Sequence, residues 1–547
     1  MSHSENKSLV PGSGYQPAQL PPDESCQIDS SHALNIYHLP DEILSQICSY
    51  ATAPKAMPMQ FDAQKSQPSM ATELRTAHAL CLVSRRFNYI STPFLFQSLV
   101  FTQTKLTGRS LTQRDLSSRP ELQEPHNLKK LFTLLRDKPD LRQHCTSLCL
   151  NYKEQPLDDS DNSEGSDEGS SQDGTSDDEH ESTEIDNMIP SESLLNYLYG
   201  QLTNVRDFQV NVTGYAVETP LFVLALLYMT KLRRLCITGH VHHTGIFNQI
   251  AILGPDHRPQ HQFETLDMSN TTYPVWDHEL FRIQQRGFLN ELQTNAGIGP
   301  IKRLLTGPDH DIEVLSALVA WPKRLERLAL QVDPHITSNS ARGGSLQQVL
   351  DTQKQSLTHL RIQGRCELGL HDFDLRDFPH LEHLALCDAT LANFSQLTLN
   401  GKDTPRLDSR ILAPRLRSLL WVLPWWLNDR PKIRDFFSTE HEKRLRLVLE
   451  MALNIKQQRK NTGEWCFGRV WVQCTVVAPE CFEEEARRNF EKDLQRIKAL
   501  DDEFGPLGIN VRHLPLPKPS TDGDGCRDRV FGLLDEVWSW DNNPYTI

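Results

Sequence analysis

The sequence lacks a long apolar run, since the longest one in its 547 residues is Leu221–Met229. A membrane-spanning helix needs about 20 apolar residues, so we expect no transmembrane segment. The N-terminus lacks a basic start followed by an apolar stretch, so no signal peptide is expected. The 12 cysteines are few and dispersed, which disfavours a disulfide framework and predicts a reducing compartment, cytoplasmic and/or nuclear.

An excess of basic charge is also missing, because the formal net charge is -14. Twelve carboxylates and no Lys or Arg lie between Asp158 and Glu184, and removing them leaves -14 + 12 = -2. The remainder is nearly neutral, which excludes a strongly basic nucleic-acid-binding protein. We therefore expect neither nucleic acid nor membrane among the partners.

Catalytic and cofactor motifs are absent from the sequence. Gly343–Gly344 lacks the Lys-Ser/Thr of a phosphate-binding loop, and His240, His242 and His243 lack Cys or acidic partners at ligand spacing. The sequence therefore predicts a non-catalytic protein with no catalytic residues, no cofactor and no metal. An α/β enzyme of unrecognised type stays an alternative.

Composition divides the chain into parts of different character. Stretches rich in Ser, Pro, Gln, Gly or acidic residues without apolar periodicity are predicted to be disordered. The predicted parts are a disordered tail (1–33), a small helical unit (34–101, with a loop at 53–71), an α/β array (127–430, interrupted by a disordered acidic insertion at 157–186) and a C-terminal region of further α/β repeats or a cap (431–547).

The helical unit is expected to contain three short helices. Apolar residues recur at helical spacing in Leu39–Tyr50 and again in Leu80–Ile90. Thr92 and Pro93 are expected to cap a short third helix. Three short helices bury little apolar area alone, so this unit is expected to bind a partner.

The array shows a repeating pattern, in which a helix-like segment is followed by a strand of the form LxxLxL, as in Leu232–Ile237 and Leu325–Leu330. The central positions 235, 266, 328, 360, 384 and 419 lie 31, 62, 32, 24 and 35 residues apart, and the interval of 62 is long enough to conceal a degenerate repeat. This rhythm predicts an α/β fold built as an irregular leucine-rich-repeat-like solenoid, with an ordinary α/β domain as the alternative.

The segment HLPDEILSQICSY, followed by ALCLVSRRFNYISTPFLFQSLVF, resembles the F-box, over about Leu39 to Val100. The phrase LVSRRFNYISTPFLF looks like the fungal F-box proteins with leucine-rich repeats. One departure is a longer loop between the first two helices, which is expected to bulge outward. In this family the F-box docks on a Skp adaptor, which links it to a cullin–RING ubiquitin ligase of the SCF type.

The resemblance implies that the Skp adaptor and the cullin scaffold are partners, and that the repeat array binds an unknown protein target for ubiquitination. A scaffold that uses the same helices outside a ligase is the alternative. The implied docking residues are apolar positions of the three F-box motifs, which are also expected to supply the core of the unit. They are Leu39, Pro40, Ile43, Leu44, Ile47, Leu82, Val83, Phe87, Pro93, Leu95 and Phe96.

A candidate contact with the target follows one of the leucine-rich strands. Trp425 and Trp426 stand beside Pro424, and paired tryptophans in a loop are typical aromatic anchors of a protein interface. The alternative is that one of them plugs the core of the array.

Overall fold

The fold is described from a computed structural model of the chain. The residues described are 39–52, 76–107, 126–156, 197–216, 228–241, 263–272, 289–290, 292–307, 312–332, 346–364, 373–387, 409–423, 437–459, 466–474 and 484–514. Trp425, Trp426, the predicted tail 1–33 and the acidic insertion 157–186 lie outside these residues, so their predictions stay untested.

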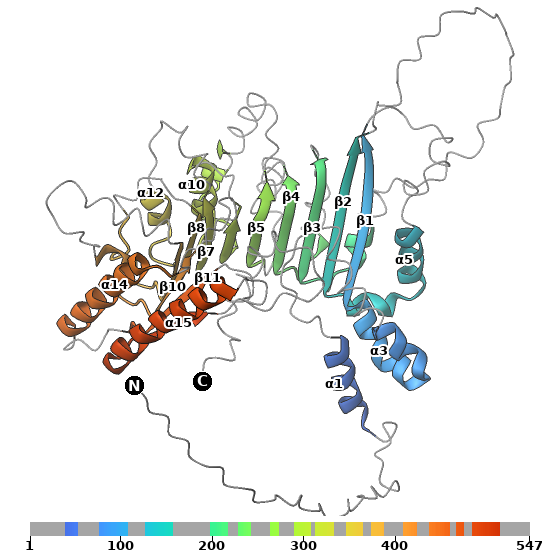
Figure 1. Ribbon diagram of the computed structural model, residues 1–547. Helices are drawn as coiled ribbons and strands as arrows, with labels where there is room; N and C mark the ends of the chain where they lie inside the picture. The colour runs from blue at the N-terminus through green and yellow to red at the C-terminus, as the bar shows by residue number, and fades with distance from the viewer. Residues whose placement is uncertain are drawn as a thin grey trace, which may run out of the picture.

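Within the described residues, twelve parallel strands form a single sheet, in which the spatial order of the strands equals their order along the chain (Figure 1). Their bounds are β1 Ser98–Thr107, β2 Ser147–Pro156, β3 Asp207–Ala216, β4 Arg234–Val241, β5 Thr265–Thr272, β6 Arg303–Thr306, β7 Arg327–Val332, β8 His359–Gly364, β9 His383–Cys387, β10 Ser418–Leu423, β11 Arg469–Cys474 and β12 Asn510–Leu514. The prediction of an α/β fold is therefore confirmed.

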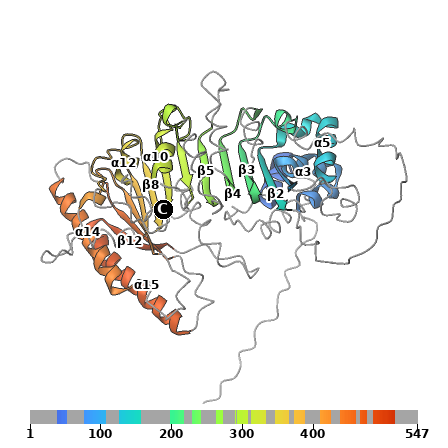
Figure 2. The same ribbon diagram turned by 90° about the horizontal axis from the view of Figure 1, so that it is seen from above.

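Helices lie at both ends of the sheet and along one side of it (Figure 2). Their bounds are α1 Asp41–Thr52, α3 Arg85–Gln97, α5 His126–Asp137, α10 Ile312–Ala320, α12 Leu346–Asp351, α14 Thr439–Gln458 and α15 Glu484–Phe504, with the 3-10 helices η4 Pro139–His144, η9 Ser409–Ile411 and η11 Gly505–Leu507. Residues 76–83 are also helical. In the described part of the chain, no helix has the length and apolar character that crossing a bilayer requires.

One apolar residue of every strand lies at the same level of the sheet. The register aligns Leu99, Leu148, Phe208, Leu235, Leu266, Leu304, Leu328, Leu360, Leu384, Leu419, Val470 and Val511. All of them are buried in one core, which α10, α12, α14 and α15 also line. Because side chains alternate along a strand, the residues before and after this row point to the opposite face, which we call the open face.

The leucine pattern located most strands but set their starts two residues early. The first leucine of a hexad, such as Leu232 or Leu325, is buried in the turn before the strand. The 62-residue interval contains β6, whose central residue is Leu304. Its hexad, IKRLLT, ends on the buried Thr306 instead of an apolar residue, which hid this strand from the pattern.

The predicted cap at Thr92 and Pro93 is wrong, because the helix break lies at Ser84. The backbone of Ser84 is extended, and its side chain accepts a hydrogen bond from the Phe87 N–H at 3.2 Å, which caps α3. Pro93 lies inside α3, where its fixed φ is compatible with helical geometry. The third predicted helix is therefore the C-terminal half of α3.

The last strand of the sheet is covered by polar and apolar contacts from α15. The Asp501 carboxylate accepts a hydrogen bond from the Val511 N–H at 2.8 Å. The buried Asp493 accepts one from the Phe437 N–H at 3.0 Å, which ties the start of α14 to α15. These contacts tie α14, α15 and β12 together, and the choice between further α/β repeats and a cap for 431–547 stays a prediction.

Candidate functional site

α1 and α3 pack against each other through a small core that is separate from the core of the sheet. The Cys48 Sγ and Ser91 Oγ atoms lie 3.3 Å apart inside the small core, and both residues are fully buried. Arg86 fastens the start of α1 by donating to the Leu39 carbonyl at 2.6 Å and to the Asp41 carboxylate at 2.6 Å. The buried apolar residues of this core are Leu44, Cys48, Phe87 and Ile90.

Other apolar side chains of α1, of residues 76–83 and of α3 are exposed to solvent. Ile43 and Ile47 lie one turn apart on α1 and are each 40% exposed. Leu82 is 73% exposed and Val83 is 53% exposed, and Tyr89 on α3 is exposed as well. Exposed large apolar side chains in one small unit are candidates for contact with another protein.

The structure thus separates the predicted docking residues, which the sequence gives only as one set, into buried, half-buried and exposed ones. Leu44 and Phe87 belong to the small core, whereas Phe96 packs against the core of the sheet. The exposed ones are Pro40, Ile43, Ile47, Leu82 and Val83, and the half-buried ones are Leu39, Pro93, Leu95 and Phe96. The buried residues hold the helices in place, and the exposed residues are the ones available to a partner.

This helical unit is fixed to the first strands of the sheet. Residue Gln97 ends α3, and β1 starts at the next residue. The Gln97 carbonyl accepts a hydrogen bond from the Thr146 N–H at 3.0 Å, next to the start of β2. The exposed apolar surface therefore has a fixed position at the β1 end of the sheet.

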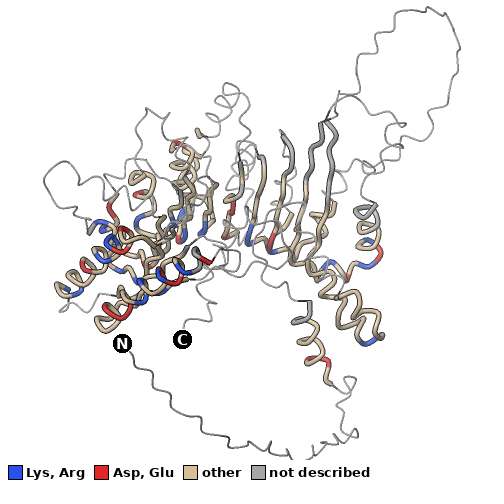
Figure 3. Tube along the Cα trace, viewed as in Figure 1, with Lys and Arg blue, Asp and Glu red and all other residues tan. Residues whose placement is uncertain are grey.

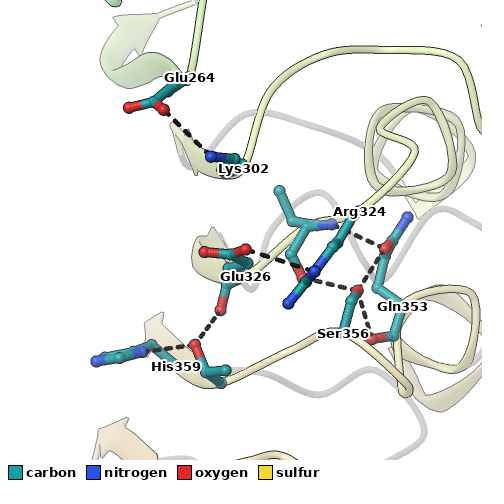
Figure 4. A network of polar contacts seen from close by, with 9 residues as sticks. Glu264, Lys302, Arg324, Glu326, Gln353, Ser356 and His359 are labelled. Carbon is teal, nitrogen blue, oxygen red and sulfur yellow. Dashed lines mark hydrogen bonds and ion pairs between the residues drawn. The ribbon is translucent and has the colours of Figure 1, made fainter.

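A buried network of polar contacts lies where the central strands start (Figure 4). The side-chain amide of the buried Gln353 accepts from the Leu325 N–H at 3.0 Å and donates to the carbonyl oxygens of Val319 at 3.0 Å and Pro322 at 2.8 Å. Ser356 Oγ donates to the Gln353 Oε1 at 2.9 Å. One side chain thus satisfies the backbone of the turn that leads into β7.

Charged residues directly before the strands form a ladder along this edge. Glu264 and Lys302 pair at 3.2 Å, as Figure 4 shows. Arg324 pairs with Glu326 at 3.4 Å. Further along the same edge, Arg417 lies 3.4 Å from Glu382. These three pairs, which we call the charged ladder, are half-exposed, so each stabilises the fold by only about 0–1 kcal/mol.

Two imidazole rings stack on the open face beside this ladder. The ring centroids of His359 and His383 lie 4.4 Å apart. His359 Nδ1 lies 2.9 Å from Thr358 Oγ1, and His383 Nδ1 lies 2.8 Å from Ser418 Oγ. Burial, reinforced by the nearby His383, Arg327 and Arg303, lowers the pKa of His359 to about 2. The His359 ring is therefore neutral at physiological pH.

Acidification is expected to destabilise the sheet through His359. The folded state keeps this ring neutral while the unfolded chain takes up a proton below its ordinary pKa of 6.5, so the stabilisation is present above that pH and is lost as the pH falls. One proton corresponds to about 1.4 kcal/mol per pH unit. Urea midpoints measured from pH 7.5 to 5 check this prediction.

The variant His359→Gln is expected to flatten that pH dependence, and the matched variant of the exposed His380, His380→Gln, to keep it. A His359→Gln profile as steep as the wild-type profile would show that other groups cause the pH dependence.

Sequence reasoning missed Gln353, His359 and His383. A signal for the histidines was present, because the residue before the central leucine of each hexad is polar, as in LTHLRI and LEHLAL. No such signal marks Gln353, whose partners lie about 30 residues earlier.

The described residues contain no group of three or more His, Cys, Asp or Glu side chains arranged to hold a metal ion. His240 lies in β4, and His242 and His243 fall outside the described residues. No family model matches the chain, and no curated protein matches it either.

Proposed function

We propose that this chain is the substrate-recognition subunit of an SCF-type E3 ubiquitin ligase. In this proposal α1, residues 76–83 and α3 are an F-box-like unit that docks on a Skp adaptor. The sheet and its helices are a leucine-rich-repeat-like solenoid that binds a protein target. The chain itself performs no chemistry.

The observation that carries the proposal is the outward apolar surface of the helical unit. Ile43, Ile47, Leu82 and Val83 stay exposed, although α1 and α3 already share a core. Covering such side chains stabilises a complex by about 25 cal/mol per Å² of apolar area. The same residues fall within the motifs that resemble the F-box, so sequence and geometry point to one surface.

The fixed junction between this unit and the sheet supports the proposed mechanism of such a subunit. A receptor accelerates ubiquitin transfer by holding the target beside the charged enzyme, which converts a bimolecular encounter into a tethered one. The hydrogen bond from Thr146 to Gln97 ties the helical unit to the sheet, which supports a fixed distance between adaptor and target in this proposal. The bond-making groups then belong to the partner enzymes.

The test is co-purification of the full chain with a Skp-type adaptor, compared with the double variant Leu39→Ala, Pro40→Ala. Capture by the intact chain and clear loss in the variant are expected, since Pro40 is exposed at the start of α1. Equal recovery of adaptor with both chains, or none with either, overturns the proposal. Adaptor binding without turnover of a bound target would instead indicate a scaffold outside a ligase.

A further inference from the structure

A row of polar side chains that includes four arginines crosses the open face at one level of the sheet. Over the eight consecutive strands β4–β11, the register aligns Arg234, Thr265, Arg303, Arg327, His359, His383, Ser418 and Arg469. We call these residues the basic row. It contains four arginines, two histidines and no carboxylate, and each member stands one position before the buried leucine row.

Much of the basic row is accessible to solvent. Arg303 and Arg469 are exposed, Arg234, Arg327 and His383 are half-buried, and His359 and Ser418 are buried. Figure 3 shows that charged residues gather at the strand starts, whereas the upper parts of the central strands are mostly uncharged. The row is therefore a band of positive charge on a chain whose net charge is -14.

Most acids near the basic row are bonded to described cations, and Asp207, which pairs in register with Arg234 next to the row, interacts electrostatically with Arg234, Arg206 and Arg233. Asp267 lies 2.8 Å from Arg234, and the three glutamates of the charged ladder bond to its own Lys and Arg residues. Glu382 also lies 4.0 Å from the His383 ring. Burial is the main cause that lowers the pKa of the His359 ring, and the neighbouring His383, Arg327 and Arg303 lower it further. Cationic side chains therefore lie close to this ring at the centre of the row.

We propose that the basic row binds an extended, Asp/Glu-rich segment of the target protein, which runs across β4–β11 on the open face. This assignment rests on the proposed function, because the segment belongs to the recognised target. Strands lie about 4.8 Å apart, so the row spans about 34 Å, the length of about ten extended residues. Carboxylates of such a segment accept charge-assisted hydrogen bonds from the arginines.

The spacing of the row favours several separate carboxylates over one phosphate group. A phosphate is held best where several cations converge on one point, whereas Arg234, Arg327 and Arg469 are spread over the width of the sheet. A nucleic acid fits less well, because the chain outside residues 158–184 is nearly neutral and has no excess of basic charge.

The test measures binding of a short fluorescein-labelled peptide of alternating Asp and Glu to the full chain by fluorescence anisotropy. The expected result is saturable binding that weakens as ionic strength rises, with no binding of the matching Asn/Gln peptide. The double variant Arg303→Gln, Arg327→Gln is expected to bind the acidic peptide at least about tenfold more weakly. The matched control Arg136→Gln, Arg488→Gln removes the same charge from exposed positions outside the row and should change binding less than about twofold.

Three outcomes would overturn the assignment. These are equal affinity of the double variant and the control, tighter binding of a singly phosphorylated neutral peptide, and tighter binding of an oligonucleotide. If the double variant unfolds, the assignment is tested instead with the single variant Arg469→Gln, at an exposed position. The salt dependence of peptide binding to the wild-type chain is then the second measurement. Adaptor capture is measured on the same preparations: its retention in the double variant separates failure of this inference from failure of the proposed function.

Discussion

The double variant Ile43→Asp, Ile47→Asp is expected to lose adaptor binding by more than about 100-fold while the sheet stays folded. Both side chains are 40% exposed and lie one turn apart on α1, so the change leaves the small core intact. In a complex, however, each carboxylate would be buried without a partner, which costs several kcal/mol. Titration calorimetry with a Skp-type adaptor and thermal unfolding of the same samples measure the two effects.

A charge-matched control is available on the same helix. Ser45→Asp, Ser49→Asp adds two carboxylates, one at a half-buried and one at an exposed position, which lie about 120° or more around the helix from Ile43 and Ile47. This control is expected to bind the adaptor within about threefold of wild type, which is below 1 kcal/mol. Wild-type affinity in the Ile43/Ile47 variant, or equal losses in both variants, would exclude this face of α1 as the docking surface.

The second large effect is expected from Gln353→Ala, which should lower the free energy of unfolding by about 3 kcal/mol or more. The substitution removes the partner of the Leu325 N–H and of the Val319 and Pro322 carbonyls. The side chain is only 6% exposed, so water cannot easily replace those hydrogen bonds. Urea unfolding followed by circular dichroism measures the loss.

The matched control is Gln355→Ala, two residues along the same turn, where the side chain is exposed. It should change the free energy of unfolding by less than about 0.5 kcal/mol. If Gln353→Ala unfolds at the same urea concentration as this control, the amide network contributes nothing measurable to stability.

The fold class and most strands could be predicted because the buried leucine row repeats along the chain. Leu328, Leu360 and Leu384 lie 32 and 24 residues apart, a spacing that one helix-like segment and one strand occupy. β6 was not predicted because Thr306 stands where an apolar residue would end its hexad. The Thr306 hydroxyl is buried without a hydrogen-bond partner. The strand starts were misplaced because periodicity does not distinguish a buried leucine in a turn from one in a strand.

The candidate docking surface could be predicted only as an undivided set. Ile43 and Leu44 are adjacent and equally apolar, yet one is 40% exposed and the other fully buried. Which side of α1 meets α3 depends on tertiary contacts such as the Arg86–Asp41 pair, and no local pattern encodes them. The basic row was not predicted as one surface for the same reason, because strand pairing brings together residues that stand about 24 to 51 positions apart.

The matching of strand order and chain order has a consequence for biosynthesis. Each strand pairs only with the strand before it and the strand after it, so a nascent chain can add one strand at a time to an existing edge as it leaves the ribosome. No strand waits for a partner made much later, which shortens the time that an unpaired edge is open to aggregation. A ribosome-bound chain that stops after β7 should therefore already protect the amides of β2–β5 from hydrogen exchange.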